Sequence, residues 1–162
     1  MLVRRMIRAA TLDVALYEEV EHDKRLTGQA ALVVVIVTVL SAIGATILHF
    51  NPMILVVSLA ASLLGWVVFA YLTYFIGTKV FGGDADVGEM LRVLGFASTP
   101  MCLGIIPLVG TPIGGIWMVV TTVVAIRQGL DVSTGKAIVT ALISMVAYLV
   151  IQGFLGRILP LP

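Results

Sequence analysis

The sequence PMILVVSLAASLLGWVVFAYLTYFIGT fills residues 52–78 and contains no Asp, Glu, Lys, Arg or His. Residues 28–48, just upstream, lack these side chains as well. About 20 helical residues cross a hydrocarbon core about 30 Å thick, so each stretch is long enough to span a bilayer. Inside lipid every backbone polar group must be satisfied internally, which continuous apolar helices achieve. The sequence therefore predicts an all-α protein that crosses the membrane more than once.

Composition supports the membrane assignment and excludes several classes of function. The 162 residues are 60% hydrophobic and 12% charged, with a mean hydropathy of +1.12, too apolar for a soluble domain of this length. The net charge of +1 gives no reason to expect a nucleic-acid partner. A single cysteine, Cys102, excludes an intrachain disulfide and any cysteine-based metal cluster. We expect no cofactor and no bound metal.

Polar breaks divide the apolar sequence into a bundle of about five transmembrane helices. The expected crossings are residues 28–50, 52–78, 92–109, 112–126 and 137–156. Proline and glycine disturb helices, and several lie in the third crossing and at the start of the fourth. We take four of them as a kinked region: Pro100, Gly104, Pro107 and Pro112. In an alternative arrangement, the third and fourth crossings form a re-entrant hairpin.

The first 26 residues form a short amphipathic segment ahead of the membrane domain, which we assign to residues 27–162. Arginines and glutamates lie on one side of the expected helix, and apolar side chains lie on the other. A basic, amphipathic helix suits the headgroup layer of an anionic leaflet. The same apolar stripe could instead pack on the cytosolic ends of the spans. The stripe comprises Leu2, Val3, Met6, Ile7, Ala10, Val14, Tyr17 and Val20.

Charge orients the predicted bundle. With the N-terminus in the cytoplasm and five crossings, nine of the ten Lys and Arg residues lie on the cytoplasmic side, and only Arg157 lies outside. The spans then contain no buried Asp, Glu, Lys or Arg, because Arg92 is placed at the cytoplasmic start of the third crossing. Ion-coupled carriers and proton pumps usually place such groups at membrane depth, so their absence counts against those classes.

No set of residues with catalytic spacing appears in the chain. There is no Ser-His-Asp set, no H-E-x-x-H motif and no phosphate-binding glycine loop, so we expect no catalytic residue and no enzyme. Asp84, Asp86 and Glu89 could hold a divalent cation, but we interpret them as a solvated acidic loop. Asp86 and Glu89 also have the spacing of a capping box for a helix that begins at Val87.

Small side chains recur at helical spacing within three of the spans. Such stripes let helices approach closely in lipid, where apolar burial no longer drives association. They could serve internal packing of one protomer or form a face for a second copy or a partner. The candidate packing or interaction residues are Ser41, Ala45, Ser58, Ser62, Gly65, Ala137 and Ala141.

Several segments of the chain resemble the Yip family, which comprises five-span membrane proteins that interact with Ypt/Rab GTPases, and in particular its compact prokaryotic members. The resemblance implies five spans, a cytosolic N-terminus, a prokaryotic inner membrane and no catalytic activity. Eukaryotic members carry longer cytosolic N-terminal regions and bind Rab GTPases; because about 26 residues stand there in this sequence, we do not extend that expectation to this chain. The resembling segments are residues 27–30, 65–66, 81–83, 91–97 with Pro100, 106–110, 115–117, 125–127 and 136–137.

Two functions remain open on the sequence alone. The first is a non-enzymatic membrane protein that contacts lipids and acts by assembling with itself or with a membrane-protein partner, as in membrane organisation or trafficking. The second is a transporter or channel for a small solute or lipid, because kinked helices can expose backbone carbonyls to a cavity. A water-open cavity between the third and fourth spans would favour transport, and a sealed bundle would favour assembly.

Overall fold

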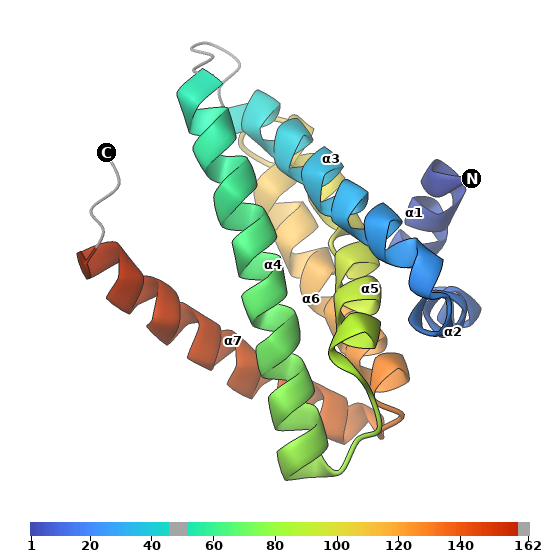
Figure 1. Ribbon diagram of the computed structural model, residues 1–162. Helices are drawn as coiled ribbons and strands as arrows, with labels where there is room; N and C mark the ends of the chain where they lie inside the picture. The colour runs from blue at the N-terminus through green and yellow to red at the C-terminus, as the bar shows by residue number, and fades with distance from the viewer. Residues whose placement is uncertain (46–51, 159–162) are drawn as a thin grey trace.

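A computed structural model describes residues 1–45 and 52–158, with side chains as far as Phe154. In this part of the chain every regular element is helical (Figure 1). Four helices are long: α3 (Thr27–Ala45), α4 (Pro52–Phe81), α6 (Gly110–Gly129) and α7 (Thr134–Ile158). The shorter elements are α1 (Leu2–Ala10), α2 (Val14–His22), the 3₁₀ turn η1 (Lys24–Leu26), α5 (Val87–Ala97) and the 3₁₀ segment η2 (Thr99–Ile105).

The long helices have the length and composition of membrane spans. Among the described residues, four candidate spans are found, and they coincide with α3, α4, α6 and α7. Large apolar side chains are exposed along α4 and α7, as expected for surfaces that contact lipid. The predicted helical membrane bundle is therefore confirmed. Residues 46–50, the expected end of the first crossing, lie outside the described residues, as does the side chain of Arg157.

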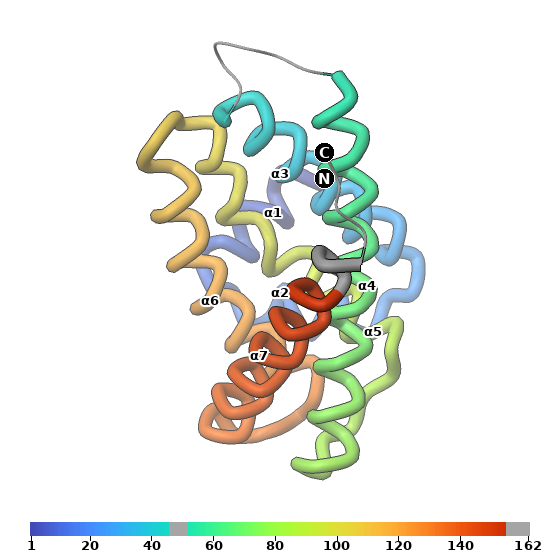
Figure 2. The backbone as a smooth tube through the Cα atoms, turned by 90° about the vertical axis from the view of Figure 1, so that its left-hand side faces the viewer, coloured from blue at the N-terminus to red at the C-terminus, as the bar shows by residue number. Residues whose placement is uncertain are grey.

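The third expected crossing is broken into two pieces rather than one continuous helix. α5 ends at Ala97, and η2 begins two residues later with Pro100 in its first turn. The hydroxyls of Ser98 and Thr99 donate to the carbonyls of Gly95 and Phe96, both at 2.7 Å, which tightens the chain at the break. α5 and η2 together rise about 30 Å. Figures 1 and 2 show η2 ending beside the C-terminus of α3, after which α6 runs back.

Glycines let α6 return directly against η2. A Cβ atom added to Gly114 would lie 2.6 Å from the carbonyl oxygen of Pro100, so no larger residue fits without a shift. Close approach through small residues is the usual basis of helix packing in lipid. Pro112 occupies the first turn of α6, where proline is tolerated, and Pro107 lies in the preceding turn. The kinked region is therefore a break at Pro100 followed by a tight reversal.

The two N-terminal helices pack on the bundle and also expose apolar side chains. Tyr17 and Val20 of α2 are fully buried in the same core as α5 and α6, whereas Val3 and Ile7 of α1 are 67% and 59% exposed. The indole Nε1 of Trp117 in α6 donates to the carbonyl of Ala10 at 2.7 Å. The apolar stripe expected from the sequence is thus divided: one part packs on the spans, and the other faces outward at the surface.

Candidate functional site

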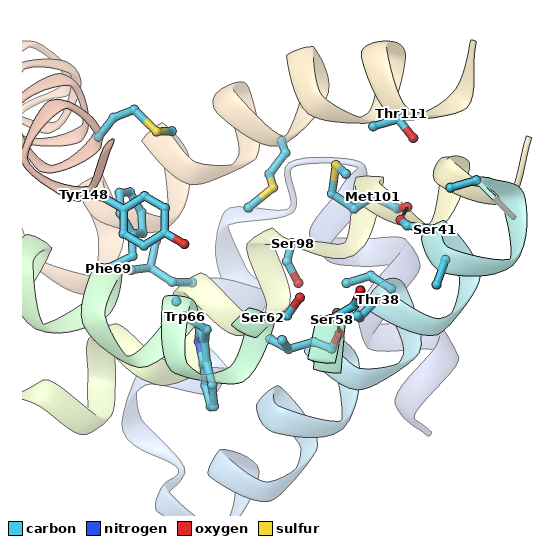
Figure 3. A pocket seen from close by; sticks show the side chains of 18 residues that line it. Thr38, Ser41, Ser58, Ser62, Trp66, Phe69, Ser98, Met101, Thr111 and Tyr148 are labelled. Carbon is cyan, nitrogen blue, oxygen red and sulfur yellow. Dashed lines mark hydrogen bonds between the residues drawn. The ribbon is translucent and has the colours of Figure 1, made fainter. Parts of the chain in front are cut away.

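A cavity of about 510 Å³ lies inside the bundle, between α3, α4, α5, η2, α6 and α7. Figure 3 shows side chains from these helices pointing into it. Five of the seven small residues singled out in the sequence line this cavity, and none of the five was expected to do so: Ser41, Ala45, Ser58, Ser62 and Gly65.

The small residues of α4 explain why space remains between the helices. Ser58, Ser62 and Gly65 lie at spacings of four and three, so they share one face of α4. The short side chains of Ser58 and Ser62 leave a gap in front of α3, whereas Gly65 makes room for the ring and hydroxyl of Tyr148. At the other end of the cavity, the rings of Phe69 and Tyr148 meet edge to face with centroids 6.0 Å apart. These aromatic rings close the cavity where the small residues end.

The wall formed by α3 and η2 is tightly packed. The Ser41 hydroxyl donates to the Met101 carbonyl at 3.0 Å, and a Cβ atom added to Gly104 would lie 2.9 Å from the Cβ atom of Ser41. Pro100 is buried beside this contact. Ser41 therefore has two roles, because it holds η2 against α3 and also lines the cavity.

The remaining small residues lie elsewhere. Ala137 is fully buried and Ala141 packs against the core, both in the first half of α7. The same half of α7 buries the hydroxyl oxygens of Thr140 and Ser144, which have no hydrogen-bond partner in the described part of the chain. Ala137 and Ala141 thus belong to helix packing within the protomer and not to the cavity wall.

Arg92 has a role that the sequence did not reveal. We expected it at the cytoplasmic start of the third crossing, and the structure shows in addition that this residue, in the second turn of α5, is only 2% exposed. Its Nε donates to the Val20 carbonyl at 2.8 Å, and its Nη2 donates to the Glu21 carbonyl. Carbonyls at the end of a helix lack intrahelical partners and attract cations, which explains the burial. No local signal marks this role, because both acceptors lie about 70 positions away in the chain.

A second, acidic pocket of about 160 Å³ lies where α2 ends against the α4–α5 and α6–α7 loops, a region we call the loop end. Its lining includes Glu21, Asp84, Glu89 and Asp131. Burial raises the pKa of Glu21 to about 7, and its Oε2 atom lacks a hydrogen-bond partner among the described residues. In the described part of the chain, no group of three or more His, Cys, Asp or Glu side chains is arranged so that it could hold a metal ion.

The loop before α5 matches the expected capping box. The Glu89 amide donates to Asp86 Oδ1 at 2.7 Å, and the Asp86 amide donates to Glu89 Oε2 at 2.6 Å. Both bonds satisfy amides at the helix N-terminus that would otherwise have no partner. Asp86 and Glu89 therefore have a structural role in starting α5.

The sequence matches one known family. The family model of the Yip1 domain matches residues 14–155, which include α2, the broken α5–η2 segment and nearly all of α7. No curated protein and no solved structure gives a significant match. The matched range covers most of the sequence, and it contains all four candidate spans. The chain therefore belongs to the Yip1 domain family of integral membrane proteins.

Proposed function

We propose that the protein is a non-enzymatic membrane scaffold that acts by assembling with itself or with another membrane protein. The surface that contacts the second copy or the partner would be the second half of α7, which diverges from α4 and the rest of the bundle (Figure 1). Every residue from Leu149 to Phe154 is exposed, so this part of the helix has no side that packs on the described part of its own protomer. This exposure is the observation that supports assembly most directly.

A polar side chain on this exposed segment strengthens the proposal. The Gln152 Nε2 donates to the Tyr148 hydroxyl at 2.6 Å. A carboxamide offers two donors and two acceptor positions, and this bond uses one of them. Amides in membrane helices commonly hydrogen-bond across to a neighbouring helix. A helix from a second copy or a partner could satisfy the remaining positions.

We also propose that the chain lies in the inner membrane of a prokaryotic cell and that the loop end is on its cytoplasmic side. Lys136 at the start of α7 donates to the Phe81 carbonyl at the end of α4, at 2.9 Å. Lys79 and Arg127 lie in the last turns of α4 and α6. Positive charges gather on the cytoplasmic side of membrane proteins, which supports this orientation.

Cysteine cross-linking in native membranes tests the assembly. In a Cys102→Ala background, Val150→Cys places a single thiol on the exposed part of α7, and Leu64→Cys places one at a comparably exposed position on α4, at 66% and 68% exposure for the native residues. A bismaleimide should trap a dimer or a heavier adduct at position 150 and not at position 64. Equal yields at both positions, together with a monomeric mass in mild detergent, would contradict assembly through α7.

Movement of a small solute or a lipid across the bilayer is a second candidate function. The observation in its favour is the cavity, because it is partly open and lies among the four candidate spans. Purified protein in reconstituted vesicles should then show saturable flux of the transported compound. Flux no faster than that of protein-free vesicles would count against transport of each compound tried.

A further inference from the structure

The lining of the cavity follows α3 and α4 lengthwise. It runs from Val34 to Ala45 on α3 and from Ser58 to Phe69 on α4. Each stretch covers about 16 Å at the rise of an α-helix. A volume of about 510 Å³ spread over this length is an elongated space. It is better suited to an extended chain than to a helix, which with its side chains is about 10–12 Å wide.

Some polar groups of the cavity wall are engaged within the protein, whereas the lining hydroxyls of Ser58, Ser62 and Thr111 make no hydrogen bond among the described residues. Thr38 donates to the Val34 carbonyl at 2.8 Å, and Ser98 and Ser41 donate to main-chain carbonyls of Gly95 and Met101. Among the described residues that line the cavity, none is charged. A buried water needs two to four polar partners, and a hydrated ion needs more. With no charge and only a few free hydroxyls among mostly apolar side chains, these walls suit a hydrocarbon better than an ion.

The mouth of the cavity is continuous with the surface that contacts lipid. Ala45, Thr111 and Met145 line the cavity and are exposed, on α3, α6 and α7 respectively. The outer faces of α4 and α7 on either side carry exposed apolar side chains. Methionine side chains also adapt readily to irregular apolar shapes, and Met101, Met118 and Met145 all line the space. The molecules present at such an opening in a membrane are lipids.

We infer that the cavity is a binding site for one hydrocarbon chain of a membrane lipid, which enters from the side facing the bilayer. The chain lies between α3 and α4 and reaches the aromatic rings of Phe69 and Tyr148. The small residues on α3 and α4 then act as the groove for this chain. The inference goes beyond both proposed functions, because a lipid chain can remain bound without any flux and without a second protein.

Fluorescence quenching of Trp66 tests this inference directly. Trp66 lines the cavity, so in a Trp117→Phe background it is the only tryptophan of the chain. In vesicles of phosphatidylcholine brominated on its acyl chains, a chain in the cavity should quench this residue. Ser62→Phe fills the cavity and should reduce the quenching at least twofold. Ala61→Phe, whose side chain is exposed on the neighbouring position of α4, is the matched control and should leave it unchanged.

Photolabelling gives a second measurement that does not depend on one tryptophan. A diazirine-bearing palmitate should label peptides of α3 and α4 that line the cavity, and Ser62→Phe should reduce this labelling about tenfold. If Ser62→Phe does not fold, Ser58→Leu blocks the same space nearer its mouth. Equal quenching in the wild type and both phenylalanine variants, or label confined to outward-facing residues, would overturn the inference. Either result would leave the cross-linking test of assembly unaffected.

Discussion

The N-terminal cap, formed by α1, α2 and α5, and the cavity are built on opposite principles. In the cap, large side chains such as Tyr17, Phe96 and Met90 are fully buried. The Arg92 guanidinium there donates hydrogen bonds to main-chain carbonyls. Around the cavity, serine and glycine occupy the facing positions, and about 510 Å³ stays free of side chains. Small residues on the facing sides of α3 and α4 thus leave space in the cavity, although Trp66, Phe69, Tyr148 and three methionines also line it. The difference indicates that the cap is a closely packed support, whereas the cavity has room for another molecule.

The largest loss of stability is expected from replacing Arg92, the buried cation of the cap. Arg92→Ala leaves the carbonyls of Val20 and Glu21 buried without their charged donor, and we expect a loss of about 3 kcal/mol in the free energy of unfolding. Arg92→Lys keeps the charge but not the planar fork, so it should recover part of this loss. Reversible unfolding in mixed micelles provides the measurement.

The control for this variant is Arg127→Ala. Arg127 is half-buried, and its Nε donates to the adjacent Gln128 side chain at 2.9 Å. We expect this change to cost no more than about 0.5 kcal/mol, as for most surface substitutions. If the two alanine variants were equally stable, the buried guanidinium would not be the element that fastens α2 to α5.

An intermediate effect is expected at the contact between η2 and α6, which supports the cavity wall. Gly114→Ala places a Cβ atom 2.6 Å from the Pro100 carbonyl oxygen and should cost about 2 kcal/mol through overpacking. Gly115→Ala is a matched control, because a Cβ atom there meets nothing within 4 Å. In a helix this control should be neutral or stabilising, by up to about 1 kcal/mol. A stabilising effect of both changes would show that the two segments are not closely packed.

The smallest effect concerns the pH dependence of the cap. Burial raises the pKa of Glu21 to about 7 from its ordinary value of 4.5. Below pH 4.5 the carboxyl is protonated in the folded and unfolded states, and the folded protein has its full stability. As the pH rises towards 7, the unfolded state loses its proton first, so the stability conferred by the neutral carboxyl is progressively lost.

Glu21→Gln should therefore raise the unfolding temperature at pH 8 more than at pH 5. Glu18→Gln is a suitable control, because it removes an exposed carboxylate from the same helix. Thermal unfolding at the two pH values, with wild type and both variants in the same detergent, measures the difference. A Glu21→Gln variant that followed the wild-type pH profile would contradict the raised pKa.

Hydrophobic runs and local capping signals made much of this fold predictable. The sequence located α3, α4, α6 and α7 as spans, and the spacing of Asp86 and Glu89 indicated the start of α5. These features depend on residues close together in the chain, so composition and periodicity reveal them. The prediction of the third crossing was less accurate. A proline shows that a helix is disturbed, but it does not show whether the helix bends or changes to a 3₁₀ segment.

The sequence by itself thus determined that the protein is a helical membrane bundle with a short amphipathic start, because lipid allows so apolar a chain few other structures. Only the tertiary structure decided what the small and the charged residues do. Ser58 and Ser62 could pack against a helix or border a cavity, and their spacing is the same in both cases. Arg92 became a buried donor because α2 ends beside it in space, a contact that depends on how distant helices meet.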